Sequence, residues 1–331
     1  MAVHSCLIVG AGLAGLVAAR ELQARGVQVT VLESNHEIGG RMATRHIDNA
    51  VFDVGAQYFT ARDERFVRLV KQWIDAGVVI EWAQGFNTAK DGEVVQAGLG
   101  EARYRGVHGM SDIPSYLAQG LDVRLEQTVT RVDLRDNGWH VETQGGVHFS
   151  ADALLLTPPI PQALALLDTG SYRLPEALRR ELEAIGAGYA PCIAVLAILD
   201  APSKIPEPGS LWLSGDPVAW IADNQQKGIS PDACAITLHA GIDFSRRRYN
   251  DPPDTVARKM IDACSEWLGA SVRSYHVHHW RYSIPETVYS QPCVYIPGKY
   301  PLVLAGEAYF GPRVEGASVS GLAAAERLLE E

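Results

Sequence analysis

Three glycines near the N-terminus, Gly10, Gly12 and Gly15, have the spacing of a phosphate-binding turn between a strand and a helix. In such a turn the first glycine permits a tight bend, the second lets the backbone approach a pyrophosphate, and the third lets the helix pack closely on the strand. The helix then presents free N–H groups and its positive dipole end to the phosphates. Glu33 ends the next predicted strand, where its carboxylate can accept hydrogen bonds from both hydroxyls of a ribose. The pattern predicts a dinucleotide site but does not separate NAD from FAD.

Further motifs favour FAD. Gly40 and Arg41 close a Gly-Gly-Arg run, and this arginine can form charge-assisted hydrogen bonds to the same pyrophosphate. Near the C-terminus an apolar run ends at Gly306 and Glu307, and a carboxylate there can bind the ribityl hydroxyls of a flavin. A last helix opens around Gly316, and its N-terminus can face the N1–C2=O edge of the flavin and stabilise the reduced anion. These residues predict FAD as the cofactor.

The elements that must position these motifs place dinucleotide-binding features at the start, middle and end of the chain. Apolar runs predict buried strands, and apolar residues at helical spacing predict helices. We expect strands at 6–9, 27–32, 123–125, 129–134, 139–143, 153–157, 190–199, 235–239, 272–280 and 302–307, and helices at 13–23, 175–185, 255–268 and 322–329, the last opening at 315–321. This indicates an α/β fold with a discontinuous Rossmann-like FAD-binding domain (1–62, 101–170 and 284–331) and an α+β substrate domain with a mixed sheet (63–100 and 171–283).

The composition excludes several classes of protein. The 331 residues suffice for two domains, and a formal net charge of −10 gives no reason to expect nucleic-acid binding. No segment reaches the ~20 continuous apolar residues of a membrane span. The five cysteines are scattered without a Cys-x-x-Cys pair, which favours a reducing, cytoplasmic compartment and no zinc site. His276, His278 and His279 lack a carboxylate or cysteine at suitable spacing, so we expect no metal.

At its motifs the chain resembles the FAD-dependent amine oxidase superfamily and, within it, the renalase family. The resemblance runs nearly from end to end. It is carried by Gly10–Gly15, Gly39–Arg41, Asp53–Thr60, Gly109–Ser111, Thr157–Pro158, Trp220–Lys227, His279–Arg281 and Gly306–Gly321. Gly55–Tyr58, the Gly109–Ser111 turn and the Trp280–Arg281 pair are the segments most typical of renalase-like proteins. The resemblance implies a fold like that of amine oxidases and p-hydroxybenzoate hydroxylase.

Carried over position by position, the resemblance implies which residues hold FAD. These are the backbone of Ala14 with Glu33, Ser34 and Arg41 at the adenosine and diphosphate, the backbone of Val129 at the adenine, Gln57 and Tyr58 beside the flavin, and Glu307 and Val314 near the ribityl chain and isoalloxazine. The chain departs from the family at Glu307, where aspartate is more common, and at His36–Glu37, where an arginine often stands. No cysteine lies between Gly306 and Gly321, the segment in which covalent family members carry one, so we expect noncovalent FAD.

The renalase resemblance also implies a reaction. The 2- and 6-dihydro isomers of NAD(P)H give a hydride to flavin N5 and return NAD(P)+, and either oxygen or a quinone then accepts the electrons. The substrate becomes aromatic as the hydride leaves, so no general base is required and catalysis rests on positioning. The residues we expect to hold this dihydronicotinamide dinucleotide are Tyr58, Phe59, Trp220 and Trp280 at the ring, Asn224 at the carboxamide and Arg62 at the diphosphate.

Two other functions remain open. An amine oxidase would need paired aromatics that enclose a neutral amine, and Tyr309–Pro312 carries aromatics slightly early in the segment that matches one wall of such a cage. A flavin-binding redox partner without turnover would need a reactive thiol or an interaction tail, and no cysteine has an evident activating neighbour.

Overall fold

Strand β1 (Ser5–Val9), formed by the N-terminal apolar run, lies inside a sheet that is parallel except at one edge. The computed structural model describes residues 3–90, 93–96, 98, 100–213 and 216–330. In sheet order the described strands are β19 (Val294–Ile296), β20 (Leu302–Leu304), β13 (Ala153–Leu156), β1, β2 (Gln28–Leu32) and β9 (Asp122–Arg124). They come from the start, middle and end of the chain, which confirms the discontinuous Rossmann-like domain, called here the first domain.

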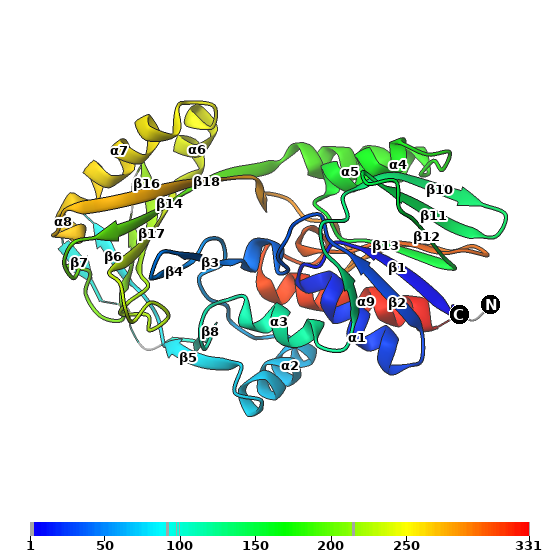
Figure 1. The fold of residues 1–331 in the computed structure, drawn as a ribbon, viewed down its shortest axis with the longest axis horizontal. Coiled ribbons are helices and arrows are strands. Elements are labelled where there is room, and N and C mark those ends of the chain that lie inside the picture. Colours follow the sequence, from blue (N-terminus) through cyan, green and yellow to red (C-terminus); the bar gives the residue numbers. More distant parts are fainter. Residues whose placement is uncertain (1–2, 91–92, 97, 99, 214–215, 331) are drawn as a thin grey trace.

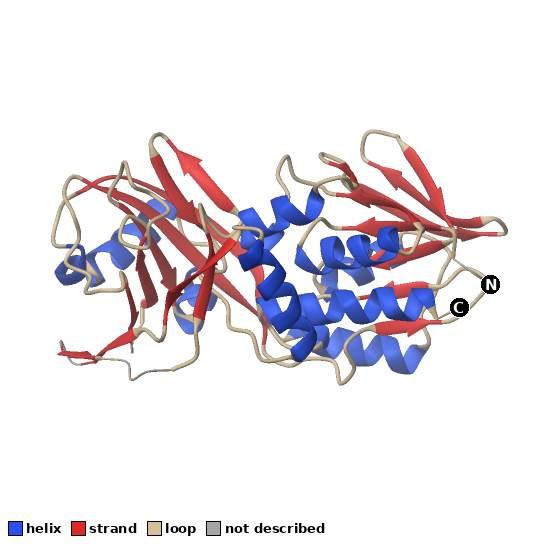
Figure 2. Ribbon diagram, turned by 90° about the horizontal axis from the view of Figure 1, so that it is seen from below, coloured by secondary structure: helices blue, strands red, loops and turns tan. Residues whose placement is uncertain are grey.

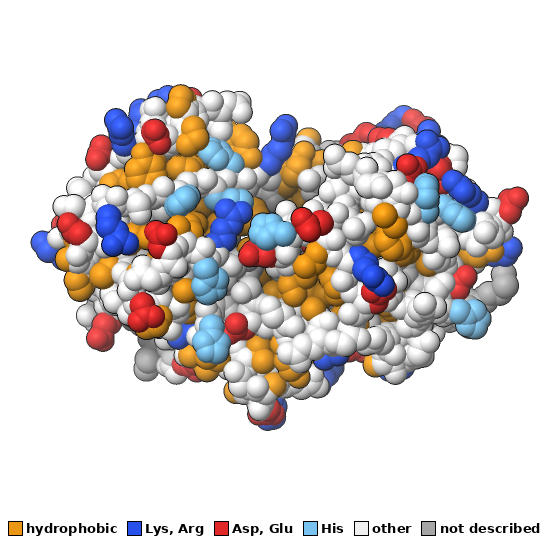
Figure 3. Space-filling view, viewed as in Figure 1, with side chains coloured by type: hydrophobic (Ala, Val, Ile, Leu, Met, Phe, Trp, Pro, Cys, Tyr) orange, Lys and Arg blue, Asp and Glu red, His pale blue; other side chains and the backbone are white. Residues whose placement is uncertain are grey.

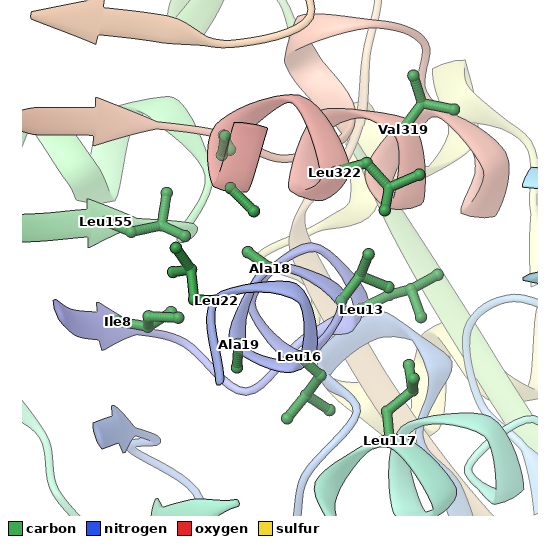
Figure 4. Packing of buried hydrophobic residues seen from close by; sticks show 14 of the residues in the cluster. Ile8, Leu13, Leu16, Ala18, Ala19, Leu22, Leu117, Leu155, Val319 and Leu322 are labelled. Carbon is green, nitrogen blue, oxygen red and sulfur yellow. The ribbon is translucent and has the colours of Figure 1, made fainter. Parts of the chain in front are cut away.

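Two helices from opposite ends of the chain cover one face of this sheet. They are α1 (Leu13–Ala24) and α9 (Val314–Leu329), and they lie side by side (Figure 4). The helices approach closely because a Cβ at Gly321 would collide with the Ala14 carbonyl oxygen. Leu22 and its apolar neighbours fill the space between the helices and the sheet (Figure 4). Small residues in both helices therefore bring the N-terminal and C-terminal motifs together.

The opposite face of the first sheet packs on a second hydrophobic cluster. A three-stranded antiparallel sheet and two helices contribute to it. These are β10 (Val129–Arg135), β11 (Gly138–Thr143), β12 (His148–Ala151), α4 (Ile160–Asp168) and α5 (Glu176–Ala187). A tight turn between Arg135 and Gly138 joins β10 and β11 as a hairpin. The parallel strands are therefore buried on both faces, as their continuous apolar sequences predict.

The second domain is built on a mixed sheet (Figure 1, Figure 2). Its described strands, in sheet order, are β18 (Val272–Pro285), β14 (Tyr189–Leu199), β17 (Ala235–Ala240), β16 (Val218–Asp223), β15 (Ser210–Leu213), β6 (Asn87–Lys90) and β7 (Glu93–Val95). The pairing of β15 with β6 is parallel and the others are antiparallel. Helices α6 (Ile242–Arg248), α7 (Pro253–Ala263) and α8 (Ser265–Leu268) pack on one face. The predicted single helix at 255–268 is thus two helices that meet at Cys264.

The other face of the second sheet meets the first domain. The hairpin of β3 (Thr44–Ile47) and β4 (Ala50–Asp53) packs against it through Phe52 and Val54. The long strands β14 and β18 run from the second domain to the first (Figure 1). A smaller pair, β5 (Val79–Ala83) and β8 (Arg103–Gly106), and helix α3 (Asp112–Ala118) complete the junction. Any site between the domains is therefore bounded by β4, its following loop and this sheet face.

Two helices lie in the first domain although their residues are in the ranges predicted for the substrate domain. The buried residues of α2 (Glu64–Asp75) join the cluster that also contains α1 and α9. Those of α5 join the cluster on the opposite face of the first sheet. Both helices are amphipathic, and each buries its apolar stripe on the nearest open face of that sheet. The predicted boundaries at 63 and 171 are therefore displaced by one helix each.

Neither a membrane-spanning helix nor a metal-binding group of side chains is found among the described residues. No helix among them is long and apolar enough to cross a bilayer. No group of three or more potential metal-binding side chains is found in the same part of the chain. Figure 3 shows several histidine side chains over the second domain and its junction with the first, and these are spread out over the surface.

Candidate functional site

The Gly10–Gly15 turn follows β1, and its three glycines have different structural roles. Gly10 has a φ of +104°, which favours glycine. A Cβ at Gly15 would collide with the Gly10 carbonyl oxygen. A Cβ at Gly12, by contrast, would meet nothing within 4 Å, and helix α1 begins there without a side-chain cap or an acidic residue in its first turn. The turn therefore leaves space and free N–H donors, including that of Ala14, as a bound pyrophosphate requires.

The Gly-Gly-Arg run lies directly against this turn. The Gly39 N–H donates to the Ala11 carbonyl at 2.9 Å, and a Cβ at Gly40 would stand 3.7 Å from the Cα of Gly12. Gly39 and Gly40 both have positive φ values, +106° and +56°, in the short helix η1 (Gly40–Met42) and its cap. The structure thus brings the two glycine motifs together at one place.

Glu33 is buried at the end of β2, and its carboxylate already binds protein donors. One oxygen accepts the Ala11 N–H at 2.9 Å, and the other accepts the Ser34 hydroxyl at 3.2 Å and two Asn35 N–H groups at 2.9 and 2.7 Å. Each carboxylate oxygen has about two acceptor positions, and Oε2 accepts only one donor, so Oε2 can still accept one ribose hydroxyl. The Glu33 carbonyl accepts the Gln127 N–H at 2.8 Å, which brings the backbone near Val129 to the same edge.

Arg41 and Glu307 form an ion pair with each other. Both terminal nitrogens of Arg41 donate to the Glu307 carboxylate, and Nη1 also donates to the carbonyls of Tyr282 and Ser283 at 3.1 Å. The Tyr189 hydroxyl donates to the same carboxylate at 2.8 Å. Burial would raise the Glu307 pKa, but Arg41 and Tyr189 outweigh it and hold that pKa below its ordinary value. The residues predicted at the pyrophosphate and the ribityl chain are therefore joined, and Tyr189 is an additional member of the group.

The loop after β4 places Gln57 and Tyr58 on opposite sides. The buried Gln57 side chain donates to the carbonyls of Asp53 at 2.6 Å and Gly55 at 3.2 Å. Tyr58 is partly exposed, and its ring centroid lies 5.8 Å from that of Trp220. Since neighbouring side chains of an extended chain point to opposite sides, Tyr58 faces the domain junction while Gln57 supports the loop backbone.

Phe59 lies in the core of the first domain and not with Tyr58. It is 4% exposed, and its ring packs edge-on against Phe66 and Trp73 of α2. The structure therefore does not bring Phe59 into the group predicted to hold the substrate ring. The physical reason is the same alternation of side chains, together with the apolar face of α2 that needs a partner.

Trp220 and Trp280 lie on the face of the second sheet that meets this loop. Trp220 is 3% exposed and packs against Tyr58 and Phe86, with 5.1 Å between the Trp220 and Phe86 ring centroids. Trp280 is partly exposed, and its Nε1 donates to the Val54 carbonyl oxygen at 3.3 Å. The structure thus brings three of the predicted aromatic residues, Tyr58, Trp220 and Trp280, to the domain junction.

His239 is on the same face, and the sequence analysis did not single it out. It pairs with Trp220 across β16 and β17, and its Nε2 lies 2.9 Å from the Val54 carbonyl oxygen. Burial lowers its pKa to about 4. A single histidine in an apolar strand carries no signal in the sequence, since its neighbours become known only from the strand register.

Asn224 and Lys227, in the turn after β16, are almost completely buried. Asn224 Nδ2 donates to the Thr237 hydroxyl at 2.9 Å, and that hydroxyl donates to the Asp53 carbonyl at 3.1 Å. Lys227 Nζ donates to the Asp53 carboxylate at 2.6 Å in an ion pair with both side chains 0% exposed. These contacts hold the loop after β4 on the second sheet. They leave Asn224 in the interior, where the structure does not present it to a substrate.

Arginines surround the exposed side of Tyr58. The Arg103 guanidinium lies 5.7 Å from the Tyr58 ring centroid. Burial raises the Tyr58 pKa, and the positive charges of Arg103 and Arg313 oppose that effect. The Arg313 side chain has no hydrogen-bond or ion-pair partner in the described part of the chain. Arg62 is exposed and is held by Glu101 through two hydrogen bonds of 2.6 Å.

The C-terminal motif forms the junction between η2 (Glu307–Tyr309) and α9. The Gly306 N–H donates to the Ser320 hydroxyl at 2.8 Å, and a Cβ at Gly316 would collide with the Gly311 carbonyl oxygen. Helix α9 begins at Val314 without a side-chain cap, so its first N–H groups are available to a flavin edge.

The aromatics at 309–312 do not form a pair. Tyr309 is 2% exposed within the hydrophobic cluster of the first domain, whereas Phe310 is 44% exposed. Tyr309 is therefore part of the core and does not supply the aromatic wall that the sequence suggested for an amine.

The fold and these groups define a two-domain oxidoreductase that binds a dinucleotide cofactor. The family model described as an NAD(P)-binding Rossmann-like domain matches residues 8–73, and that of the flavin containing amine oxidoreductases matches residues 82–329. The chain belongs to the flavin-containing amine oxidoreductases and is an FAD-dependent enzyme. This sets aside the flavin-binding partner without turnover.

Individual relatives agree with this family. Renalase from Mus musculus is 25% identical over 295 residues, 84% of each chain. Putrescine oxidase from Kocuria rosea is 39% identical over 66 residues, which are 20% of this chain and 14% of that protein. Among solved structures, cyclohexylamine oxidase from Brevibacterium oxydans has a TM-score of 0.74 at 16% identity over 99% of each chain. A putative protoporphyrinogen oxidase from Exiguobacterium sp. has the same TM-score and identity over 100% of each. These structures show the fold alone.

The residues present fit FAD. The open space at Gly12 and the uncapped start of α1 suit the diphosphate, and Glu33 retains an acceptor for the ribose. The uncapped start of α9 at Val314 suits the isoalloxazine edge. When bound, FAD supplies the hydride acceptor, and the chain supplies binding and orientation.

Proposed function

We propose that this enzyme oxidises the 2- and 6-dihydro isomers of NAD(P)H to NAD(P)+ with FAD, and passes the electrons to oxygen or a quinone. The observation that carries the proposal is the positive charge around Tyr58. Arg103 lies over the Tyr58 ring and also pairs with Glu101 at 3.6 Å. The charge of Arg313, whose side chain forms no hydrogen bond or ion pair among the described residues, acts on both Tyr58 and Glu101. Such charge attracts the diphosphate of a dinucleotide and repels an ammonium group. Similarity to mouse renalase over most of both chains supports the same substrate.

The part of this chain in the reaction is to position the ring. Tyr58 and Trp280 are partly exposed and offer flat apolar surfaces at one junction, and the buried Trp220 packs against Tyr58. When bound, FAD would accept the hydrogen of a ring C–H bond together with both electrons of that bond, so the ring would become an aromatic pyridinium without loss of a proton. No general base is therefore needed. This agrees with the histidines nearby, since burial lowers the pKa of His239 and His278 to about 4 and makes both weak bases at neutral pH.

We propose that FAD is bound noncovalently and that the enzyme works in the cytoplasm. All five cysteines are free, and burial raises the pKa of each thiol, so none is activated to bond a flavin. Free thiols also suit a reducing compartment.

Amine oxidation is the second candidate, because the family and several structural neighbours bear amine oxidase names. An amine is cationic at neutral pH and would approach Arg103 and Arg313 against their charge. Tyr309, in the segment that matches one wall of an amine cage, is buried in the core and does not face a substrate. These observations favour the dinucleotide.

Anaerobic stopped-flow spectroscopy of the FAD-loaded enzyme tests the proposal. Partly isomerised NADH, ordinary NADH and a panel of amines are mixed with the enzyme in turn, and flavin absorbance is followed. Rapid bleaching by the isomer mixture alone supports the proposal. Bleaching by amines alone would show that the second candidate is correct.

A further inference from the structure

The hydrogen bond of His239 determines which of its ring nitrogens carries a proton. Nε2 lies 2.9 Å from the Val54 carbonyl oxygen, and a carbonyl oxygen can only accept. Nε2 must therefore be the N–H, and in the neutral ring Nδ1 is then an acceptor. Nδ1 has no hydrogen-bond partner among the described residues.

The surroundings of His239 are those expected of a ring-binding site. His239 is half-buried on the sheet face at the domain junction, and it pairs with Trp220 on the adjacent strand. Trp280 Nε1 donates to the same Val54 carbonyl at 3.3 Å. A flat molecule held on the partly exposed Trp280 at this face would thus have the Nδ1 acceptor of His239 at its edge.

The charged and titratable groups around His239 leave it neutral at neutral pH. Burial is the main cause of its low pKa of about 4, and the charge of Lys227 adds to it, while the Val54 carbonyl opposes both. Lys227 is itself paired with Asp53. His278 is also neutral and lies on the same face, two strands away, opposite Ala194.

We propose that His239 binds the carboxamide of the dihydronicotinamide ring, with Nδ1 accepting a hydrogen bond from the amide N–H. This rests on the proposed function and takes over the role that the sequence predicted for Asn224, which the structure buries against Thr237. A neutral acceptor at this place also suits the product. The ring gains a positive charge as the hydride leaves, and an uncharged imidazole does not oppose it.

Two substitutions separate substrate binding from a purely structural role of His239. In His239→Gln the amide nitrogen can still donate to Val54, but the acceptor at the Nδ1 position is lost. In His239→Asn the amide oxygen can occupy the Nδ1 position, while the contact with Val54 is lost. His278→Gln serves as a control for loss of an imidazole on this face, because His278 packs against Trp280 but lies two strands away from His239.

The experiment measures binding of NAD+ and of its 3-acetylpyridine analogue to the FAD-loaded enzymes, by titration of the flavin absorbance. The analogue lacks the amide N–H, so the ratio of the two dissociation constants reports the contact itself. We expect the natural enzyme and His278→Gln to prefer NAD+ by about tenfold, as one hydrogen bond allows. His239→Gln should lose this preference and His239→Asn should keep part of it. A structural role would weaken both ligands equally.

The outcomes distinguish a wrong carboxamide assignment from a wrong proposed function. If the isomers bleach the flavin and NAD+ binds, yet His239→Gln keeps the full preference, the carboxamide assignment is wrong and the proposed function stands. If the natural enzyme neither binds NAD+ nor reacts with the isomers, the proposed function itself is wrong.

Discussion

Replacing Lys227 with Met removes one partner of an ion pair in which both side chains are fully buried. Lys227 Nζ lies 2.6 Å from one oxygen of Asp53, and the other oxygen accepts the Thr44 hydroxyl at 2.6 Å and the Met110 N–H at 2.8 Å. In the variant the carboxylate would keep these neutral donors and the electrostatic interaction with Arg105, but it would have no ion-pair partner in contact. Breaking a buried pair in this way costs about 3–5 kcal/mol, so we expect the free energy of unfolding to fall by about that amount.

Two further variants test the reason for this loss. Lys71→Met removes the same charge from the Lys71–Asp75 pair, where the N–O distance is 2.9 Å but the side chains are 74% and 62% exposed. That pair should contribute only about 0.3–0.5 kcal/mol. The double variant Asp53→Asn with Lys227→Met leaves no unpaired charge, so its loss should be smaller than the sum of the single losses.

The assay is urea unfolding at saturating FAD, followed by tryptophan fluorescence, since bound cofactor itself adds stability. A decrease of less than about 1 kcal/mol in the unfolding free energy of Lys227→Met would refute the reasoning, because a buried carboxylate without its ion-pair partner should destabilise the fold by more than that. Additive losses in the double variant would show that the pair is not the source of the effect.

Three other substitutions have definite expected results. Gly12→Val should keep the unfolding free energy within about 1 kcal/mol, because Gly12 has an ordinary φ of −76° and open space around it, but should greatly lower FAD content, measured by absorbance. Glu307→Gln should be less stable near pH 7 and lose less stability on acidification. The folded-state pKa of Glu307 is lowered, so the ionised carboxylate stabilises the fold above the ordinary carboxyl pKa. This stabilisation is lost as the pH falls through the lowered pKa. Thermal unfolding at a series of pH values checks this, and parallel curves for the two proteins would contradict it. Arg313→Glu should weaken NAD+ binding by about tenfold at low salt and less at high salt, and unchanged binding in titrations would count against the charge argument.

The dinucleotide-binding parts could be predicted because they depend on local rules. Gly10, Gly12 and Gly15 have their roles through backbone geometry within one turn, and the apolar runs around them form the strands of the first sheet. The contact between this turn and Gly40 also follows from a short chain connection. Such features need no knowledge of which distant segments pair.

The remaining site residues depend on pairings that a sequence does not contain. His239 and Lys227 gain their meaning only when β17 and the turn after β16 are placed against the loop that follows β4. Tyr189 meets Glu307 across more than a hundred residues. Phe59 is an aromatic residue like those that bind substrate rings. It follows Tyr58 directly in an extended segment, so its side chain points to the opposite side and packs in the core.

The second domain holds the loop after β4 by its backbone, and this explains how one sheet can serve both the cofactor and the substrate. The Asp53 carbonyl accepts a hydrogen bond from Thr237 of the second sheet. The Val54 carbonyl accepts hydrogen bonds from His239 and Trp280. These donors contact oxygens that any residue at 53 and 54 would present. The sheet therefore positions the loop through backbone oxygens as well as through the Lys227–Asp53 ion pair, and Tyr58 remains free to face the junction. A change of substrate within this fold can then come from side chains on the sheet face, while the loop keeps its place beside the cofactor.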